Sequence, residues 1–128
     1  MTYTHGFAWI DHREARIFAI GRDGSEEHTV HEHGGPKHIH RTADHVHLGK
    51  APPDEVFLGQ VADALDGFKA IVIAGPGSTR NELAGFLTEH RPALAKRVWG
   101  IEAMDHPTDP QIIAAARKYF RAEDRMHG

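Results

Sequence analysis

The run of residues 69–87, KAIVIAGPGSTRNELAGFL, constrains the fold more than any other part of the chain. Residues 70–74 are apolar without alternation, which is typical of a strand covered on both faces. The turn 75–77 (Gly-Pro-Gly) breaks the strand, and Thr79 with Glu82 matches a capping box that starts a helix. A buried strand, a turn and a helix in this order indicate an α/β sheet with parallel strands.

The segments before and after this run predict further elements. Residues 7–11, 15–20 and 26–32 have the composition of short strands, and Asp23-Gly24 favours a hairpin between the last two. A helix is predicted between Asp54, which favours its N-terminus, and Gly67, which closes its C-terminus, with Phe57, Val61, Ala64, Leu65 and Phe68 on one stripe. Residues 98–104 form the last strand. Pro92 is expected to bend or interrupt the helix before it. Thr108 and Gln111 offer a second capping box for a final helix, with Pro110 in its first turn.

The predicted order is therefore β-β-β-α-β-α-β-α, a mixed five-stranded α/β sheet with helices packed on it. We expect one domain over residues 1–128, with a mobile loop at about 33–53. The third strand is polar and is expected at an edge, where it offers pairing with another copy.

Composition excludes several function classes. The chain has 128 residues, a net charge of -3 and no cysteine. The charge gives no general nucleic-acid footprint, and the absence of cysteine excludes disulfides and thiolate metal sites. No run has the length of a membrane span, and the first residues do not resemble a secretory signal. We expect a cytoplasmic protein without membrane contact.

Seven of the twelve histidines lie between His28 and His47, several of them two residues apart. In an extended chain such pairs point to one side, so they suit zinc or nickel. Two alternatives stay open: a hydrated polar loop, and a loop that becomes cationic when protonated. The candidate metal ligands are His31, His33, His38 and His40.

The glycine turn has two interpretations. A strand-to-helix junction can hold an anion at the helix N-terminus, which makes Gly75, Gly77, Ser78 and Thr79 candidates. The sequence lacks the ending of a P-loop, and a tight turn with an N-cap explains it equally well.

Three sequence blocks resemble the middle domain of the archaeal and eukaryotic peptide-chain release factors and Pelota. They are FAWIDHREARIFAIGR, HEHGGPKH and AIVIAGPGSTRNELAGFL, and the resemblance covers roughly residues 7–104. It implies a ribonuclease-H-like fold of the translational machinery component group, in the stand-alone form found in bacteria.

The family's functional loop carries Gly-Gly-Gln, which promotes peptidyl-tRNA hydrolysis. Here Pro36 follows Gly34-Gly35, and proline has neither an amide side chain nor a backbone N–H. The resemblance therefore implies a non-catalytic module that needs no cofactor and contacts RNA, the ribosome or a protein. The candidate contact residues are His33, Gly34, Gly35, Pro36, Lys37 and His38.

A ribonuclease-H-like fold also raises the hypothesis of a metal-dependent nuclease or hydrolase. Asp11, Glu102 and Asp105 lie near strand ends, but Asp11 is better interpreted as a turn residue. Trp9 and Trp99 are expected to be core aromatics on neighbouring strands. The basic residues of the later helices are interpreted as a solvated face, with RNA contact as the alternative.

Overall fold

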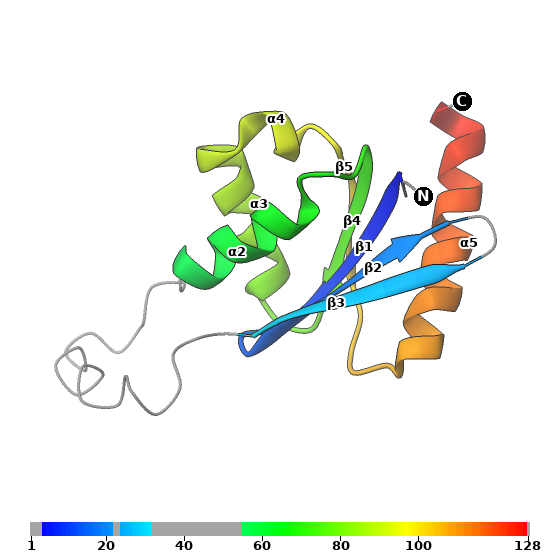
Figure 1. Cartoon of the computed structure of the whole chain (residues 1–128), viewed down its shortest axis with the longest axis horizontal. Helices are drawn as coiled ribbons and strands as arrows, with labels where there is room; N and C mark the ends of the chain where they lie inside the picture. Colours follow the sequence, from blue (N-terminus) through cyan, green and yellow to red (C-terminus); the bar gives the residue numbers. More distant parts are fainter. Residues whose placement is uncertain (1–3, 22–23, 32–54, 128) are drawn as a thin grey trace, which may run out of the picture.

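The computed structural model describes residues 4–21, 24–31 and 55–127, and side chains as far as residue 122. The elements in chain order are β1 (His5–Ile10), β2 (Glu14–Ile20), β3 (Ser25–His31), α2 (Glu55–Leu65), β4 (Ala70–Gly75), α3 (Thr79–His90), α4 (Pro92–Ala95), β5 (Val98–Ala103) and α5 (Asp109–His127). Figure 1 shows them along the chain. The predicted loop at about 33–53 lies outside the described residues.

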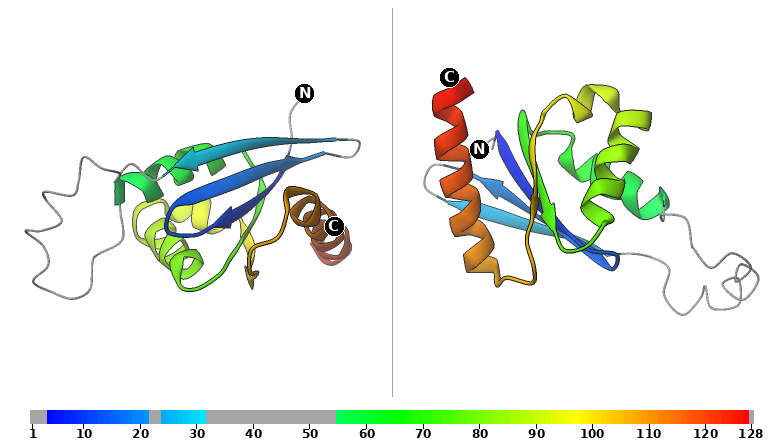
Figure 2. Two further views of the ribbon diagram at one scale, coloured as in Figure 1. Left: turned by 90° about the horizontal axis from the view of Figure 1, so that it is seen from below. Right: turned by 180° about the vertical axis from the view of Figure 1, so that it is seen from behind.

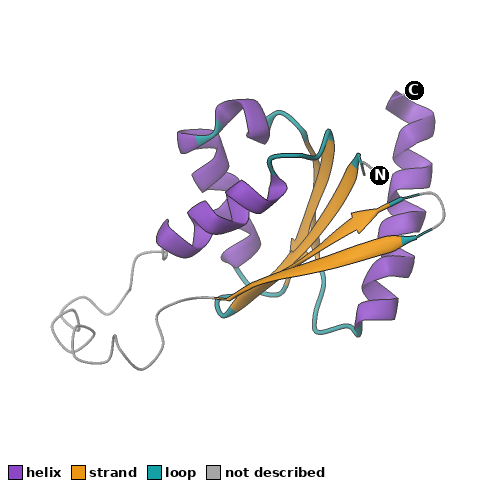
Figure 3. Cartoon of the chain, viewed as in Figure 1, coloured by secondary structure: helices purple, strands orange, loops and turns teal. Residues whose placement is uncertain are grey.

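The five strands form one sheet in the order β3-β2-β1-β4-β5 (Figure 3). The first three strands are antiparallel neighbours, and β4 runs parallel to both β1 and β5. Helices α3 and α4 make the crossover from β4 to β5. The mixed five-stranded α/β sheet predicted from the sequence is confirmed, and β3 is an edge strand as expected.

Helices cover both faces of the sheet. Figure 2 shows α5 on one side and α2, α3 and α4 on the other. All residues of β4 are buried: Ile71 and Ile73 pack with α2 and α3, whereas Val72 packs with α5. This two-sided burial is why the strand is apolar at every position. No helix in the described part of the chain is long and apolar enough to cross a membrane.

The helix ends follow the predicted capping in part. Thr108 and Gln111 form the reciprocal box: the Thr108 N–H donates to Gln111 Oε1 (2.9 Å), and the Gln111 N–H donates to Thr108 Oγ1 (3.3 Å). The cap predicted at Thr79 is wrong, because Ser78 is the N-cap of α3 and its hydroxyl donates to Glu82 Oε2 (3.3 Å) instead of capping an N–H. Pro92 does interrupt the helix, since α3 ends at His90 and α4 starts at Pro92.

Two further expectations need correction. Phe68, assigned to the helical stripe, lies beyond α2, which ends at Leu65, and the Phe68 N–H closes a turn onto the Leu65 carbonyl (3.1 Å). Trp9 and Trp99 are not on neighbouring strands, because β4 lies between β1 and β5. Trp9 is buried under α5, and Trp99 is partly buried beside the same cluster. The apolar pattern of a strand carries no information about strand order.

Candidate functional site

Most of the predicted loop lies outside the described residues: His33, Gly34, Gly35, Pro36, Lys37, His38 and His40. His31 is the candidate metal ligand that the structure describes. It ends β3, its side chain is 70% exposed, and its Nδ1 lies 3.9 Å from Glu14 Oε1. Among the described residues no three His, Asp or Glu side chains gather as a metal site requires. A zinc or nickel site therefore stays a prediction that depends on residues beyond His31.

The turn between β4 and α3 is held by its own side chains. Gly75 has φ +154° and Gly77 has φ +62°, so the glycines adopt backbone angles that other residues rarely take. The Arg80 guanidinium donates to the carbonyls of Gly75 (2.8 Å) and Gly77 (2.5 Å). The Ser78 hydroxyl is directed at the Glu82 carboxylate in the first helical turn. Because this carboxylate repels anions, anion binding at Gly75, Gly77, Ser78 and Thr79 stays a prediction without further support.

Asp11 serves the turn between β1 and β2. Its Oδ1 accepts the N–H groups of Arg13 (2.8 Å) and Glu14 (2.9 Å), and its own N–H donates to the Glu14 carbonyl (3.0 Å). This is the behaviour of an aspartate that closes a turn through its side chain. The interpretation of Asp11 as a turn residue is confirmed.

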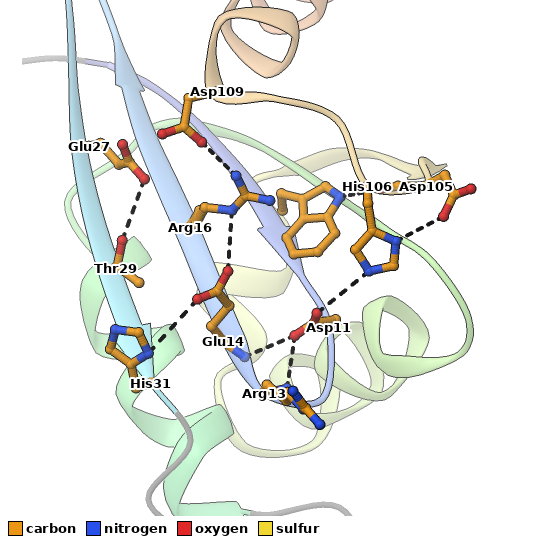
Figure 4. A network of polar contacts seen from close by, with 11 residues as sticks. Asp11, Arg13, Glu14, Arg16, Glu27, Thr29, His31, Asp105, His106 and Asp109 are labelled. Atoms are coloured by element: carbon orange, nitrogen blue, oxygen red, sulfur yellow. Dashed lines mark hydrogen bonds and ion pairs between the residues drawn. The ribbon is translucent and has the colours of Figure 1, made fainter.

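A histidine that the sequence did not single out lies beside Asp11. His106 Nε2 is 3.9 Å from Asp11 Oδ2, and its Nδ1 is 3.0 Å from Asp105 Oδ1 (Figure 4). The Trp9 Nε1–H donates to the Asp105 carbonyl (2.8 Å), and the His106 ring packs edge-on against Trp9 at 5.3 Å. These contacts tie the loop after β5 to the end of β1. The carboxyl ends of parallel strands meet at one edge, so His106 could have been located from its place after the last strand.

The carboxylates at the ends of β1 and β5 give little support to nuclease chemistry. Asp105 is 95% exposed and its carboxylate is engaged with His106, and Glu102 is exposed on β5. Asp11 already accepts backbone donors. A two-metal site needs several carboxylates on one small patch, which the described residues do not offer. The nuclease hypothesis stays a prediction, to be dropped if DNA and RNA survive incubation with the chain and magnesium or manganese.

Arg16 joins β2 to α5. Its Nη1 donates to Asp109 Oδ1 (2.6 Å), its Nε lies 3.5 Å from Glu14 Oε2, and its guanidinium carbon lies 4.5 Å from the centre of the Trp9 ring (Figure 4). The sequence analysis did not predict these partners. Asp109 is far away in the chain, and only the fold brings the two together.

Glu27 on β3 belongs to the same charged group. Although the Glu27 side chain is exposed, loss of some of its hydration raises the pKa of Glu27, and the neighbouring Asp109 carboxyl raises it further by hydrogen bonding and repulsion. Arg16 and the Thr29 hydroxyl act in the opposite direction without cancelling the rise. Glu27 and Asp109 therefore form an acidic pair beside the Arg16 guanidinium, where α5 begins.

Three arginines among the basic residues make contacts within the chain. Arg91 forms an ion pair with Asp63, and Arg97 donates to the carbonyls of Asp66 (2.7 Å) and Phe68 (2.8 Å). Arg117 donates to the Gly21 carbonyl (3.0 Å). These contacts anchor helices and turns, so the three guanidinium groups have partners within the chain, where the sequence analysis expected a solvated face.

Comparison by sequence found no matching family model and no matching curated protein. Comparison of structures found the fold in translation proteins. Pelota of Archaeoglobus fulgidus matches with a TM-score of 0.68 and 19% identity over 99% of this chain and 36% of that chain. Pelota of Thermoplasma acidophilum matches with a TM-score of 0.61 and 21% identity over 93% of this chain and 32% of that chain.

A third match is an archaeal translation termination factor, aRF1, with a TM-score of 0.54 and 14% identity over 96% of this chain and 40% of that chain. The present chain thus spans between about a third and two fifths of these proteins. The chain has the fold of a Pelota- or release-factor-like domain, as the resemblance implied.

Proposed function

We propose that this Pelota-like chain is a stand-alone, non-catalytic, cytoplasmic binding module of translation, which contacts RNA, the ribosome or a protein partner. The observation that carries the proposal is the structural match to Pelota over nearly the whole chain. S. cerevisiae Dom34, described as a translation termination-like factor in RNA quality control that interacts with Hbs1, matches with a TM-score of 0.51. We infer that residues 1–128 form one domain equivalent to the middle domain of these proteins.

The contact surface in this proposal is the segment His33, Gly34, Gly35, Pro36, Lys37 and His38. It follows the edge strand β3 directly in the chain, because β3 ends at His31. Lys37 supplies a permanent positive charge and the histidines add charge on protonation, which suits phosphate groups. Pro36 supplies no N–H and no side-chain amide at the place where the family has glutamine, so the proposal excludes peptidyl-tRNA hydrolysis.

Cosedimentation with ribosomes from the native cell tests this function. We expect association that weakens between low and moderate salt, because contacts to phosphates release counterions. Replacing His33, Lys37 and His38 together by alanine should reduce the bound fraction at least several-fold. The matched control replaces His12, Lys69 and His90, which are the same residue types at exposed positions of the described chain.

The two triple variants separate the outcomes. Association that is lost only in the loop variant supports the proposal. Equal loss in both variants would show that charge anywhere on the surface suffices, and no association at either salt concentration would refute a ribosome contact. A pull-down from the native cell, repeated with the loop variant, then tests the protein-partner form of the same proposal.

A second candidate function is transition-metal binding, favoured by the environment of His31. The imidazole is exposed at the end of β3 with the Glu14 carboxylate 3.9 Å away. A carboxylate beside a ligating histidine orients the ring and raises its basicity. Titration calorimetry with zinc and nickel should detect a site that disappears when His31, His33, His38 and His40 are changed to alanine. No heat of binding in the wild-type chain would refute it.

A further inference from the structure

The outer edge of β3 has backbone groups that no described strand pairs. β3 is the first strand in the order β3-β2-β1-β4-β5 (Figure 1). The Gly21 N–H donates to the Gly24 carbonyl (2.9 Å), so these two residues are a hydrogen-bonded pair. This pair determines which residues of β3 direct their backbone N–H and C=O groups toward β2. Inward and outward residues alternate along an antiparallel strand. The backbone groups of Glu26, His28 and Val30 therefore point to β2, and those of Glu27, Thr29 and His31 point outward.

Within the described residues, β3 lacks three common protections of an edge strand: a bulge, a proline and a lysine. All of Ser25–His31 is in continuous register with β2, without a bulge. The strand holds no proline and no lysine, which commonly block edges. The opposite edge strand, β5, pairs with β4 through a register shift between Ile71 and Val72. Of the two edges of the described sheet, β3 is the more regular template.

We propose that β3 pairs antiparallel with β3 of a second copy of this chain, about a twofold axis through Thr29. In this register Thr29 lies opposite Thr29, and Glu27 of each copy lies opposite His31 of the other. Backbone groups of all these residues point outward, so each pair exchanges hydrogen bonds across the new interface. The ten-strand sheet that results removes both free β3 edges at once.

Side-chain chemistry favours this register over the two others in which an outward-facing residue lies opposite its own copy. Moving the axis by two residues toward the N-terminus places Glu27 opposite Glu27, and moving it by two toward the C-terminus places His31 opposite His31. With the axis at Thr29, a carboxylate meets an imidazole, whose N–H donates to it whether or not the ring is charged. Threonine pairs and opposite-charge pairs are favourable cross-strand neighbours.

The side chains of Glu27, Thr29 and His31 are placed where they can contact a second copy of the chain. Glu27 and His31 are exposed, and both project on the α5 face of the sheet together with Thr29. Asp109 and Arg16 flank Glu27, and Glu14 flanks His31 (Figure 4). The Thr29 hydroxyl lies 3.4 Å from Glu27 Oε2 and is also positioned at the centre of the proposed pair. On the other face His28 of each copy meets Val30 of the other.

Disulfide trapping tests the register directly, because the chain contains no cysteine. In Thr29→Cys the two Cα atoms lie about 5.5 Å apart in the proposed pair, within the range that a disulfide spans. In the control Ser25→Cys the two sulfurs belong to residues about 27 Å apart, at roughly 3.4 Å per residue. With diamide as oxidant we expect Thr29→Cys to form covalent dimers at least tenfold faster than Ser25→Cys.

Charge exchange supplies a second, independent measurement by light scattering after size exclusion. Glu27→Lys and His31→Glu should each reduce the dimer fraction, and the double variant Glu27→Lys/His31→Glu should restore it by reversing the pair. Thr29→Pro should give a folded monomer, since the lost N–H faces outward and the ladder to β2 is kept. Circular dichroism confirms folding of each variant. Equal crosslinking at positions 25 and 29, or a monomer at every concentration, would overturn the proposal.

Discussion

Replacement of Gly75 by alanine tests whether the close contact between β4 and β1 requires a glycine at the end of β4. Gly75 ends β4 with φ +154°, and a Cβ atom added there would run into the carbonyl oxygen of Ile10 on β1. Ile10 and Gly75 belong to the ends of two paired parallel strands, so relief requires the strands to separate. Gly77 provides the matched control, because its φ is +62° and a Cβ would meet nothing within 4 Å.

The two substitutions differ by a steric contribution. An unfavourable backbone angle costs about 1–3 kcal/mol, and forcing extra atoms into a packed region costs about 1–3 kcal/mol more. We therefore expect Gly75→Ala to lower the free energy of unfolding by roughly 2–6 kcal/mol. Gly77→Ala should cost only about 1–2 kcal/mol. Against a typical total of about 5–15 kcal/mol, the first change brings the protein close to unfolding.

Urea unfolding followed by tryptophan fluorescence measures the difference, because Trp9 is buried against α5. With a slope of about 1–3 kcal/mol per molar urea, the midpoint of Gly75→Ala should lie on the order of 1 M or more below that of Gly77→Ala. If Gly75→Ala does not fold, soluble expression of Gly77→Ala alone gives the same ranking. Equal midpoints for the two variants would refute the steric argument.

Three further outcomes are expected in the same assay. Thr108→Ala removes the reciprocal cap of α5 and should cost about 1 kcal/mol, whereas a cost near zero would mean that water replaces the cap. Gly85→Ala, on the exposed face of α3 with no atom near the new methyl group, should stabilise by roughly 0.5–1 kcal/mol; a loss of stability would contradict the helix geometry. Glu27→Gln should raise the urea midpoint at pH 7, because the raised pKa of Glu27 means that its ionised form is disfavoured in the folded chain. That gain should vanish below the ordinary glutamate pKa of 4.5, where the carboxyl is protonated in both states; a gain that persists in acid would exclude the ionisation as its cause.

Local sequence predicted the elements that depend on neighbours in the chain. The apolar run of β4, the capping box at Thr108 and the side-chain turn at Asp11 all follow from residues within a few positions of each other. The same local reasoning failed at Thr79, because Ser78 takes the N-cap position although only Thr79 has a glutamate three residues later. Capping patterns locate a helix start to within a residue or so, since adjacent hydroxyls compete for it.

The candidate site was less accessible to this reasoning. His106 reaches Asp11 and Arg16 reaches Asp109 only after distant segments have packed together. No spacing rule links residues so far apart in the chain. A histidine or aspartate directly after a predicted strand is the one local signal that such an edge offers, and it does not say which strands are neighbours.

The sequence by itself determined that β4 is buried on both faces, that three strands precede it and that helices alternate with strands after it. This follows because side-chain periodicity and turn chemistry are local properties. Only the tertiary structure decided that β4 separates Trp9 from Trp99, and that Arg16 on β2 reaches Asp109 at the start of α5. Strand order depends on the free energy of packing between distant segments, and no short stretch of the chain determines that free energy.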